Sequence, residues 1–285
     1  MTPSTVPRLV ARDLVASGAV PGAAAETGPR PEAVRGRARA GPPRRVRVWL
    51  PAHEQALLLD LDRDGVLTTA QVHRRHYPGR SRKTVLNRLA LFTAAGLVVR
   101  RVWGYDPRDG RRVLSGWCAT GRGLRRVGLA VPAVRGREGA LASLAHDATV
   151  ADLRERVEAD LAGEGVRWTT ERELARGESG PSAPTDQVAR VGQRRRPDGV
   201  LTLADGRRIA VEVDTSRHAA GYLTLKVAAY RRAIAQGDYA AVVWYAVSGG
   251  TMEAVRRALD AHGGADRAAG RLDVCPIPAG VTVYR

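Results

Sequence analysis

The sequence predicts a mixed α/β (α+β) protein with an N-terminal winged helix-turn-helix and a C-terminal mixed-sheet domain. Its 285 residues are enough for two domains of roughly 100–200 residues each. Residues 48–130 carry three helical patterns followed by two short strands, and residues 146–285 alternate helices with strands. Hydrophobic residues make up 44% of the chain, which is enough to build a core in each part.

Residues 1–47 are predicted to be a flexible basic arm. They hold seven of the 16 prolines and nine arginines against three acids, with no sustained hydrophobic period. Such a composition offers too little apolar surface to fold by itself. Two interpretations stay open, an arm that lies along DNA phosphates and an extension with no role in binding.

The winged-helix prediction rests on apolar spacing and on capping residues. Pro51 opens a first helix, Thr68–Thr69 cap a short second helix, and Ser81 is placed as the N-cap of a third. Gly96 stands where the third helix is expected to end. The side chains expected to be buried are Ala56, Leu57, Leu58 and Leu61 in the first helix and Val85, Leu86, Leu89 and Phe92 in the third.

A hairpin and a last helix complete this first domain. The strands are predicted at residues 97–103 and 111–117, on either side of a turn at residues 106–110. Thr120 then caps the last helix. Residues 131–145, which contain proline and glycine, are predicted to be a linker.

The second domain is predicted to span residues 146–285 around a mixed sheet. Residues 240–247 are almost continuously apolar, as expected for a strand that is buried on both faces. Residues 199–203 and 207–214 are predicted to pair as a hairpin. The remaining expected elements are helices at 146–164, 171–176, 219–236 and 251–262 and strands at 166–170 and 281–284.

The positive charge of the chain is concentrated in its first 135 residues. The formal net charge is +17, of which +6 falls in residues 1–47 and +10 in residues 48–135. A field this asymmetric suits a polyanion that docks on the N-terminal half. The alternative is a genome bias, because 44 of the 46 basic residues are Arg; this bias does not explain why acids are scarce in one half.

Double-stranded DNA is therefore the predicted partner. No acid occurs between Gly65 and Tyr105. The start of the third helix is placed to contact base edges, and the hairpin arginines are placed to reach phosphates or a minor groove. The alternative is a winged helix that makes only protein contacts. The predicted DNA-binding residues are Arg80, Arg82, Lys83, Thr84, Asn87, Arg88, Arg100, Arg101, Arg108, Arg111 and Arg112.

Three carboxylates are the strongest signal of chemistry in the second domain. Asp198 opens one strand of the predicted hairpin, and Glu212 and Asp214 share one face of its partner strand. Acids are uncommon on buried strands, and a shared divalent cation would relieve their repulsion. Oxygen ligands of this kind suit Mg²⁺, with Mn²⁺ as an alternative. Asp198, Glu212 and Asp214 are therefore the predicted metal ligands.

This arrangement resembles the PD-(D/E)XK nuclease superfamily, which has the restriction-endonuclease-like fold. The resemblance implies that Asp198 and Glu212 bind the metal and that Glu171 is an additional acid. The lysine of the motif falls at Asp214 in this chain, and Lys226 in the following helix is expected to take its place. These five side chains are the predicted catalytic residues.

Several further segments point to a narrower group. They are residues 97–128, His146-Asp147, residues 168–174, Arg196-Pro-Asp198-Gly, Glu212-Val-Asp214-Thr and Lys226-x-x-x-Tyr230. With them, residues 50–285 resemble the replication-relaxation family of plasmid and integrative-element proteins, which pairs a winged helix with a nuclease-like domain. The resemblance implies a role in plasmid replication, relaxation or mobilisation, with replication or mobilisation proteins as further partners.

Two functions stay open for such a chain. One is a metal-dependent endodeoxyribonuclease that nicks or cleaves DNA, and the other is a non-catalytic DNA-binding regulator or replication accessory factor that keeps the nuclease-like fold as a scaffold. A protein-binding adaptor is a third. His73 and His76 are expected to face phosphate or solvent, and His146 to serve a helix start. No membrane span or secretory signal is recognised, so a cytoplasmic location is expected.

Overall fold

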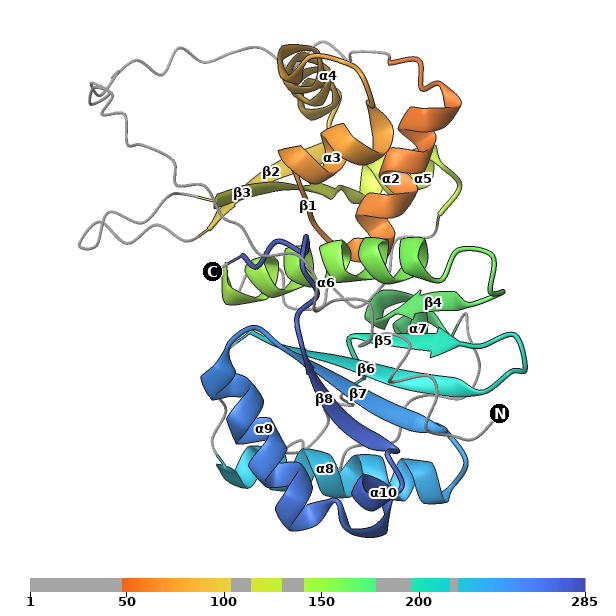
Figure 1. Ribbon diagram of the computed structural model, residues 1–285. Coiled ribbons are helices and arrows are strands. Elements are labelled where there is room, and N and C mark those ends of the chain that lie inside the picture. The colour runs from red at the N-terminus through yellow and green to blue at the C-terminus, as the bar shows by residue number, and fades with distance from the viewer. Residues whose placement is uncertain (1–47, 104–113, 130–140, 178–195, 216–219, 285) are drawn as a thin grey trace, which may run out of the picture.

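The computed structural model describes residues 48–103, 114–129, 141–177, 196–215 and 220–284, and it is a mixed α/β structure (Figure 1). The arm predicted at residues 1–47, most of the predicted linker, and Arg108, Arg111 and Arg112 lie outside the described residues. Within the five described segments, no helix is long and apolar enough to cross a membrane.

The N-terminal part packs helices on a small antiparallel sheet. Its elements are α2 (Ala52–Asp64), β1 (Leu67–Thr68), α3 (Thr69–His76), α4 (Arg82–Ala94), β2 (Val98–Trp103), β3 (Leu114–Ala119) and α5 (Gly121–Arg126). The strand order is β1-β3-β2, with β3 antiparallel to both neighbours. Leu57, Leu89, Phe92 and Trp117 are buried in the core between the helices and this sheet.

These helices begin at the capping residues predicted from the sequence, and α4 ends near the predicted glycine. Thr68 caps α3 in a capping box, Thr120 caps α5, and Ser81 Oγ accepts the Thr84 N–H at 3.2 Å at the start of α4. After α4 the chain turns at Gly96 with φ 68°, a left-handed conformation that glycine adopts without a Cβ clash.

Two residues expected in the core are exposed instead. They are Ala56 of α2 and Leu86 of α4, and Leu86 keeps 40% of its surface in solvent. The core side of α4 is formed by Val85, Leu89 and Phe92, which are fully buried. Leu86 lies off this side and faces outward, while Arg88 makes an ion pair with the buried Glu54 of α2.

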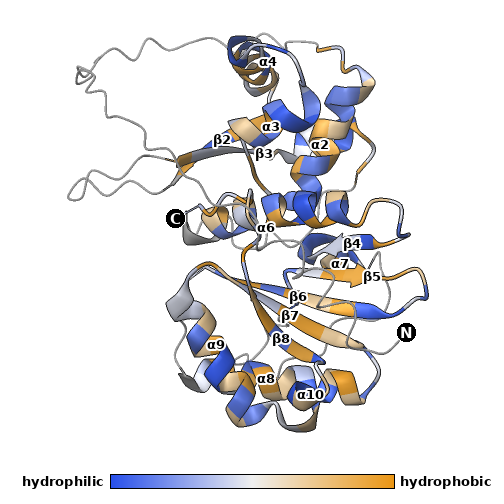
Figure 2. Cartoon of the chain, in the orientation of Figure 1, coloured by the Kyte–Doolittle hydropathy of each residue, from blue (hydrophilic) through white to orange (hydrophobic). Residues whose placement is uncertain are grey.

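The C-terminal part contains a five-stranded mixed sheet between helical layers. Its elements are α6 (Leu141–Asp160), β4 (Arg167–Thr170), α7 (Glu171–Arg176), β5 (Gly199–Thr202), β6 (Arg208–Asp214), α8 (Ala220–Ala235), β7 (Ala241–Ala246), α9 (Gly249–His262), α10 (Gly264–Ala268) and β8 (Leu272–Pro276). The strand order is β4-β5-β6-β7-β8, antiparallel from β4 to β6 and parallel from β6 to β8. Helices α8 and α9 cover one face and α6 the other, with the apolar strands between them (Figure 2).

Two boundaries of this part differ from the prediction. The helix expected from residue 146 already begins at Leu141. The strand predicted at residues 281–284 is wrong, because the last strand of the sheet is β8. The tail instead lies against α6, where the Tyr284 N–H donates to Thr149 Oγ1 at 3.1 Å and the Thr282 N–H donates to Asp152 Oδ2 at 3.2 Å.

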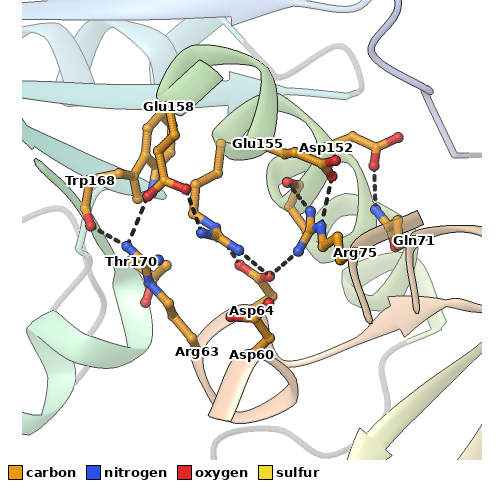
Figure 3. A network of polar contacts seen from close by, with 12 residues as sticks. Asp60, Arg63, Asp64, Gln71, Arg75, Asp152, Glu155, Glu158, Trp168 and Thr170 are labelled. Carbon is orange, nitrogen blue, oxygen red and sulfur yellow. Dashed lines mark hydrogen bonds and ion pairs between the residues drawn. The ribbon is translucent and has the colours of Figure 1, made fainter. Parts of the chain in front are cut away.

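Buried charges join α6 to the N-terminal part (Figure 3). Asp64, at the end of α2, accepts two hydrogen bonds from Arg154 of α6, at 2.9 and 2.8 Å. It accepts a third from Arg75 of α3 at 2.7 Å, and Arg75 donates to Glu155 of α6 at 2.6 Å. Asp64, Arg75 and Arg154 are almost completely shielded from solvent. Helix α6 therefore packs on both parts of the chain, and the boundary predicted at residues 131–145 stays a prediction.

Other side chains extend this network outward. Arg63 of α2 reaches Glu158 at 3.1 Å, and Arg74 of α3 reaches Asp152 at 2.8 Å and Glu155 at 2.7 Å. Arg74 belongs to the acid-free stretch between residues 65 and 105. Its guanidinium faces carboxylates of α6, so it does not contribute to the basic surface of α4.

Candidate functional site

Two neighbouring strands bring the predicted carboxylates together. Gly199 of β5 pairs with Val211 of β6, so Asp198, immediately before β5, lies beside the end of β6. Its Oδ2 accepts the Val213 N–H at 2.7 Å. The hairpin therefore places Asp198 next to Glu212, as the spacing of these two acids in the sequence suggested.

Lys226 reaches the same cluster from α8. Its Nζ lies 2.9 Å from Glu212 Oε2 and 3.7 Å from Asp214 Oδ1, and all three side chains are buried. Tyr230, one helical turn further, donates its hydroxyl to Glu212 Oε1. Tyr230 was not predicted as a site residue, although its spacing of four from Lys226 places both on one face of a helix.

Burial and charge act together on this cluster. Burial raises the pKa of Glu212 to about 8; Lys226 opposes this shift, and the charge of Asp198 adds to it. Burial lowers the pKa of Lys226, but Glu212 and Asp214 outweigh it and hold the amine above its ordinary range. Lys226 thus remains a cation, and Glu212 holds a proton more readily than an ordinary glutamate does.

His146 is a neighbour of Asp198 that sequence reasoning assigned to a helix start. Within α6, its Nε2 lies 3.3 Å from Asp198 Oδ2 and 3.0 Å from the Val213 carbonyl, and its Nδ1 lies 3.5 Å from Asp147 Oδ1. Burial lowers the pKa of His146, but Asp198 and Asp147 raise it well above its usual range. Asp198 therefore sits beside a second cation of the chain. The His146-Asp147 dipeptide stood out in the sequence, but nothing local linked it to Asp198.

Glu171 borders a shallow pocket that opens beside Asp198. It is the first residue of α7, and its pocket is also lined by His146, Asp147 and Arg172. Desolvation by the surrounding protein raises the pKa of Glu171, as do the charges of Asp198 and Asp147, while the charges of His146 and Arg196 oppose this shift. Glu171, predicted as an additional acid of the site, thus lines the same pocket as Asp198.

The carboxylates do not form a set of metal ligands in this arrangement. Among the residues that the structure describes, no three His, Cys, Asp or Glu side chains are grouped so that they could hold one metal ion. Glu212 is bound by Lys226 and Tyr230, and Asp198 by His146 and the β6 backbone. A divalent cation at this position would have to displace Lys226 and His146 from the acids. That Asp198, Glu212 and Asp214 bind a metal ion stays a prediction, and these contacts do not favour it.

The first turns of α4 form the exposed basic face of the N-terminal part. Arg82, Lys83, Thr84 and Asn87 are exposed there, and Arg80 is exposed just before the helix. No carboxylate of the described residues contacts this face in an ion pair. Its cations therefore lie at the protein surface.

The other predicted DNA-binding residues are placed differently. Arg88 pairs with Glu54, donates to the Trp49 carbonyl at 3.0 Å and lies over the ring of Phe92, so its guanidinium is held by the fold. Arg100 on β2 donates to Ser115 Oγ at 3.0 Å, and Arg101 beside it is exposed.

The two histidines of α3 make separate contacts. His73 Nε2 lies 2.6 Å from the Arg80 carbonyl. His76 is buried, with its Nε2 3.1 Å from Asp60 Oδ2, which corrects the expectation that it faces phosphate or solvent.

Comparison with known proteins identifies the family of this chain. No similar curated protein and no similar solved structure was found. The model of the replication-relaxation family, however, matches residues 58–243, well over half of the 285 residues. The match runs from α2 to β7 and includes both the basic face of α4 and the carboxylate cluster. The chain therefore belongs to the replication-relaxation family.

Proposed function

We propose that this protein binds duplex DNA through a winged helix formed by residues 48–130 and acts in the replication, relaxation or mobilisation of a plasmid or integrative element. The observation that carries the proposal is the exposed, acid-free basic face at the start of α4. Membership of the replication-relaxation family supports a replication- or relaxation-related role.

The order of elements supports a winged helix. Helix, strand, two helices and an antiparallel strand pair follow one another, and β1 joins the sheet beside β3. In this fold the third helix presents its N-terminal residues to the major groove. Here that helix is α4, which is held from behind by its core residues and by the pair of Arg88 with Glu54.

Different side chains of this surface serve different purposes. Arg82, Lys83 and Arg101 are exposed cations that suit phosphate oxygens, which position a protein on DNA without reading its sequence. The exposed amide of Asn87 offers a donor and an acceptor, which suit a base edge.

Binding is tested with a fluorescein-labelled duplex by anisotropy over a range of salt concentrations. The log of the affinity should fall linearly with the log of the salt concentration, with a slope of about −0.9 per phosphate contact. The Arg82→Ala/Lys83→Ala variant is expected to make this slope shallower by about two contacts. The matched control is Arg256→Ala/Arg257→Ala, which removes one half-buried and one exposed cation from α9 and should leave the slope unchanged. Equal slopes in all three proteins would refute α4 as the binding element.

A second candidate function is metal-dependent cleavage of DNA by the C-terminal part. It is favoured by the order from α6 to β7, a helix, three antiparallel strands with the short α7 after the first, a helix and a parallel strand. It is also favoured by Asp198 standing beside Glu212 on neighbouring strands. It is opposed by the ion pairs that Lys226 and His146 make with these acids. We propose that the domain serves as a scaffold, with cleavage as the alternative.

A cleavage assay on supercoiled plasmid distinguishes the scaffold role from metal-dependent cleavage. The plasmid is incubated with Mg²⁺ or Mn²⁺ and with wild type, Asp198→Ala or Asp205→Ala; the last removes an exposed acid at the tip of the β5–β6 hairpin. Nicking by wild type and Asp205→Ala but not by Asp198→Ala would establish cleavage at this cluster. If none of the three cuts while all shift DNA on a gel, the scaffold assignment stands.

A further inference from the structure

The surface of α4 contains an apolar residue that the core does not use. Leu86 is 40% exposed, one of only a few large apolar side chains left exposed among the residues that the structure describes. It lies between the charged first turn of the helix and the small, exposed Ala90, and beside Asn87. Attraction of the surrounding cations to phosphate does not explain why an apolar side chain is exposed in the middle of this face.

Leu86 and Asn87 differ from their neighbours in what they can recognise. Arg82 and Lys83 attract phosphate whatever the sequence. A leucine is attracted to an apolar group, and the thymine C5-methyl is the apolar group that base edges present in the major groove. An asparagine amide matches the N6 donor and N7 acceptor of adenine. Leu86 and Asn87, about 100° apart around the exposed side of α4, thus carry complements to thymine and to adenine.

We propose that Leu86 and Asn87 form a specificity-determining patch that selects A·T base pairs in the major groove. This inference rests on the proposed DNA binding and adds which base pairs the protein recognises. The small Ala90, one turn after Leu86, lets the helix backbone approach the base edges. The charge of the surrounding face favours DNA over a second copy of this basic chain, because two copies would bring Arg82 and Lys83 into repulsion.

The test starts with selection of binding sites from a random duplex library by the full-length protein. The selected duplex is then made in two altered forms. In the first, uracil replaces thymine at one position at a time and removes only the methyl group. In the second, 7-deazaadenine replaces adenine and removes only N7. Binding is measured for wild type, Leu86→Ala, Asn87→Ala and Leu225→Ala. Leu225 lies on α8, is 49% exposed and is the matched control.

When uracil replaces thymine at one particular position, the affinity of wild type and of Leu225→Ala is expected to fall about fourfold, which corresponds to the loss of one buried methyl-sized group. Leu86→Ala should bind the thymine duplex about fourfold more weakly than wild type does. Its affinity should be the same for the thymine and the uracil duplexes. Asn87→Ala should bind roughly tenfold more weakly and lose its response to 7-deazaadenine. Circular dichroism of each variant checks that the fold is kept.

The outcomes separate this inference from the proposed function. If wild type binds no duplex even at low salt, the proposed DNA binding itself fails. If it binds but selects G·C pairs, or if Leu86→Ala still responds to uracil as wild type does, the specificity patch is wrong and DNA binding survives. If Leu86→Ala instead abolishes dimer formation in sedimentation, Leu86 covers a second copy of the chain, and the inference is equally overturned.

Discussion

Replacing Asp64 by alanine should weaken the packing of the N-terminal part on α6. Asp64 is almost completely shielded from solvent and accepts three charged hydrogen bonds, two from Arg154 and one from Arg75. The alanine leaves two guanidinium groups buried without this carboxylate. Removing one partner of a buried ion pair typically costs about 3–5 kcal/mol. Because Arg154 keeps Glu158 and Arg75 keeps Glu155, the lower half of that range is expected.

The assay is urea denaturation followed by far-ultraviolet circular dichroism and tryptophan fluorescence. The reporters lie in both parts of the chain, with Trp117 on β3 and Trp168 and Trp244 in the C-terminal sheet. The expected result is a lower free energy of unfolding for Asp64→Ala and an intermediate loss for Asp64→Asn, which keeps the shape of the side chain.

The matched control removes an exposed pair from the same helix. Arg156 and Asp160 of α6 lie 2.8 Å apart, and both side chains are more than two-fifths exposed. Arg156→Ala is expected to cost less than about 1 kcal/mol. If Asp64→Ala costs no more than Arg156→Ala, the buried network does not hold the two parts together and the reasoning fails.

Three further outcomes are expected. Phe92→Ala should cost about 3–5 kcal/mol in urea denaturation because it empties a core position, while Leu86→Ala should stay within about 0.5 kcal/mol; similar losses would contradict the orientation of α4. Lys226→Met should destabilise the fold strongly by removing the ammonium that Glu212 faces in the protein interior, and adding Glu212→Gln should restore part of the loss; additive losses would refute the ion pair. Burial raises the pKa of Glu155, but hydrogen bonds from two arginines of α3 outweigh it and hold that pKa at about 2. The stability it contributes is therefore present above about pH 4.5 and is lost as the pH falls toward 2, and Glu155→Gln should flatten this part of the pH profile measured by thermal unfolding.

Much of the local structure could be predicted from sequence because its causes are local. Thr68, Ser81 and Thr120 cap the helices that follow them, since a side-chain oxygen needs only the next three residues to find its N–H partner. The meeting of Asp198 with Glu212 followed from the length of one hairpin. The fully buried strand β7 followed from its apolar run.

What the sequence left open depended on contacts between distant segments. Periodicity gave α4 an apolar stripe but could not say which part of that stripe packs; Val85, Leu89 and Phe92 are buried against distant core residues, and Leu86 is exposed. Likewise, the last strand is β8 because it pairs with β7, while the tail is held by α6.

The chemistry of the carboxylate cluster divides in the same way. The sequence determined that three acids and one lysine meet at the end of a hairpin, because strand spacing and one helix bring them there. Only the tertiary structure decided that His146, 52 residues before Asp198 in the chain, stands beside it as a second cation. Charge balance in a buried cluster is set by every element that packs on it, and no local pattern in the sequence records that packing.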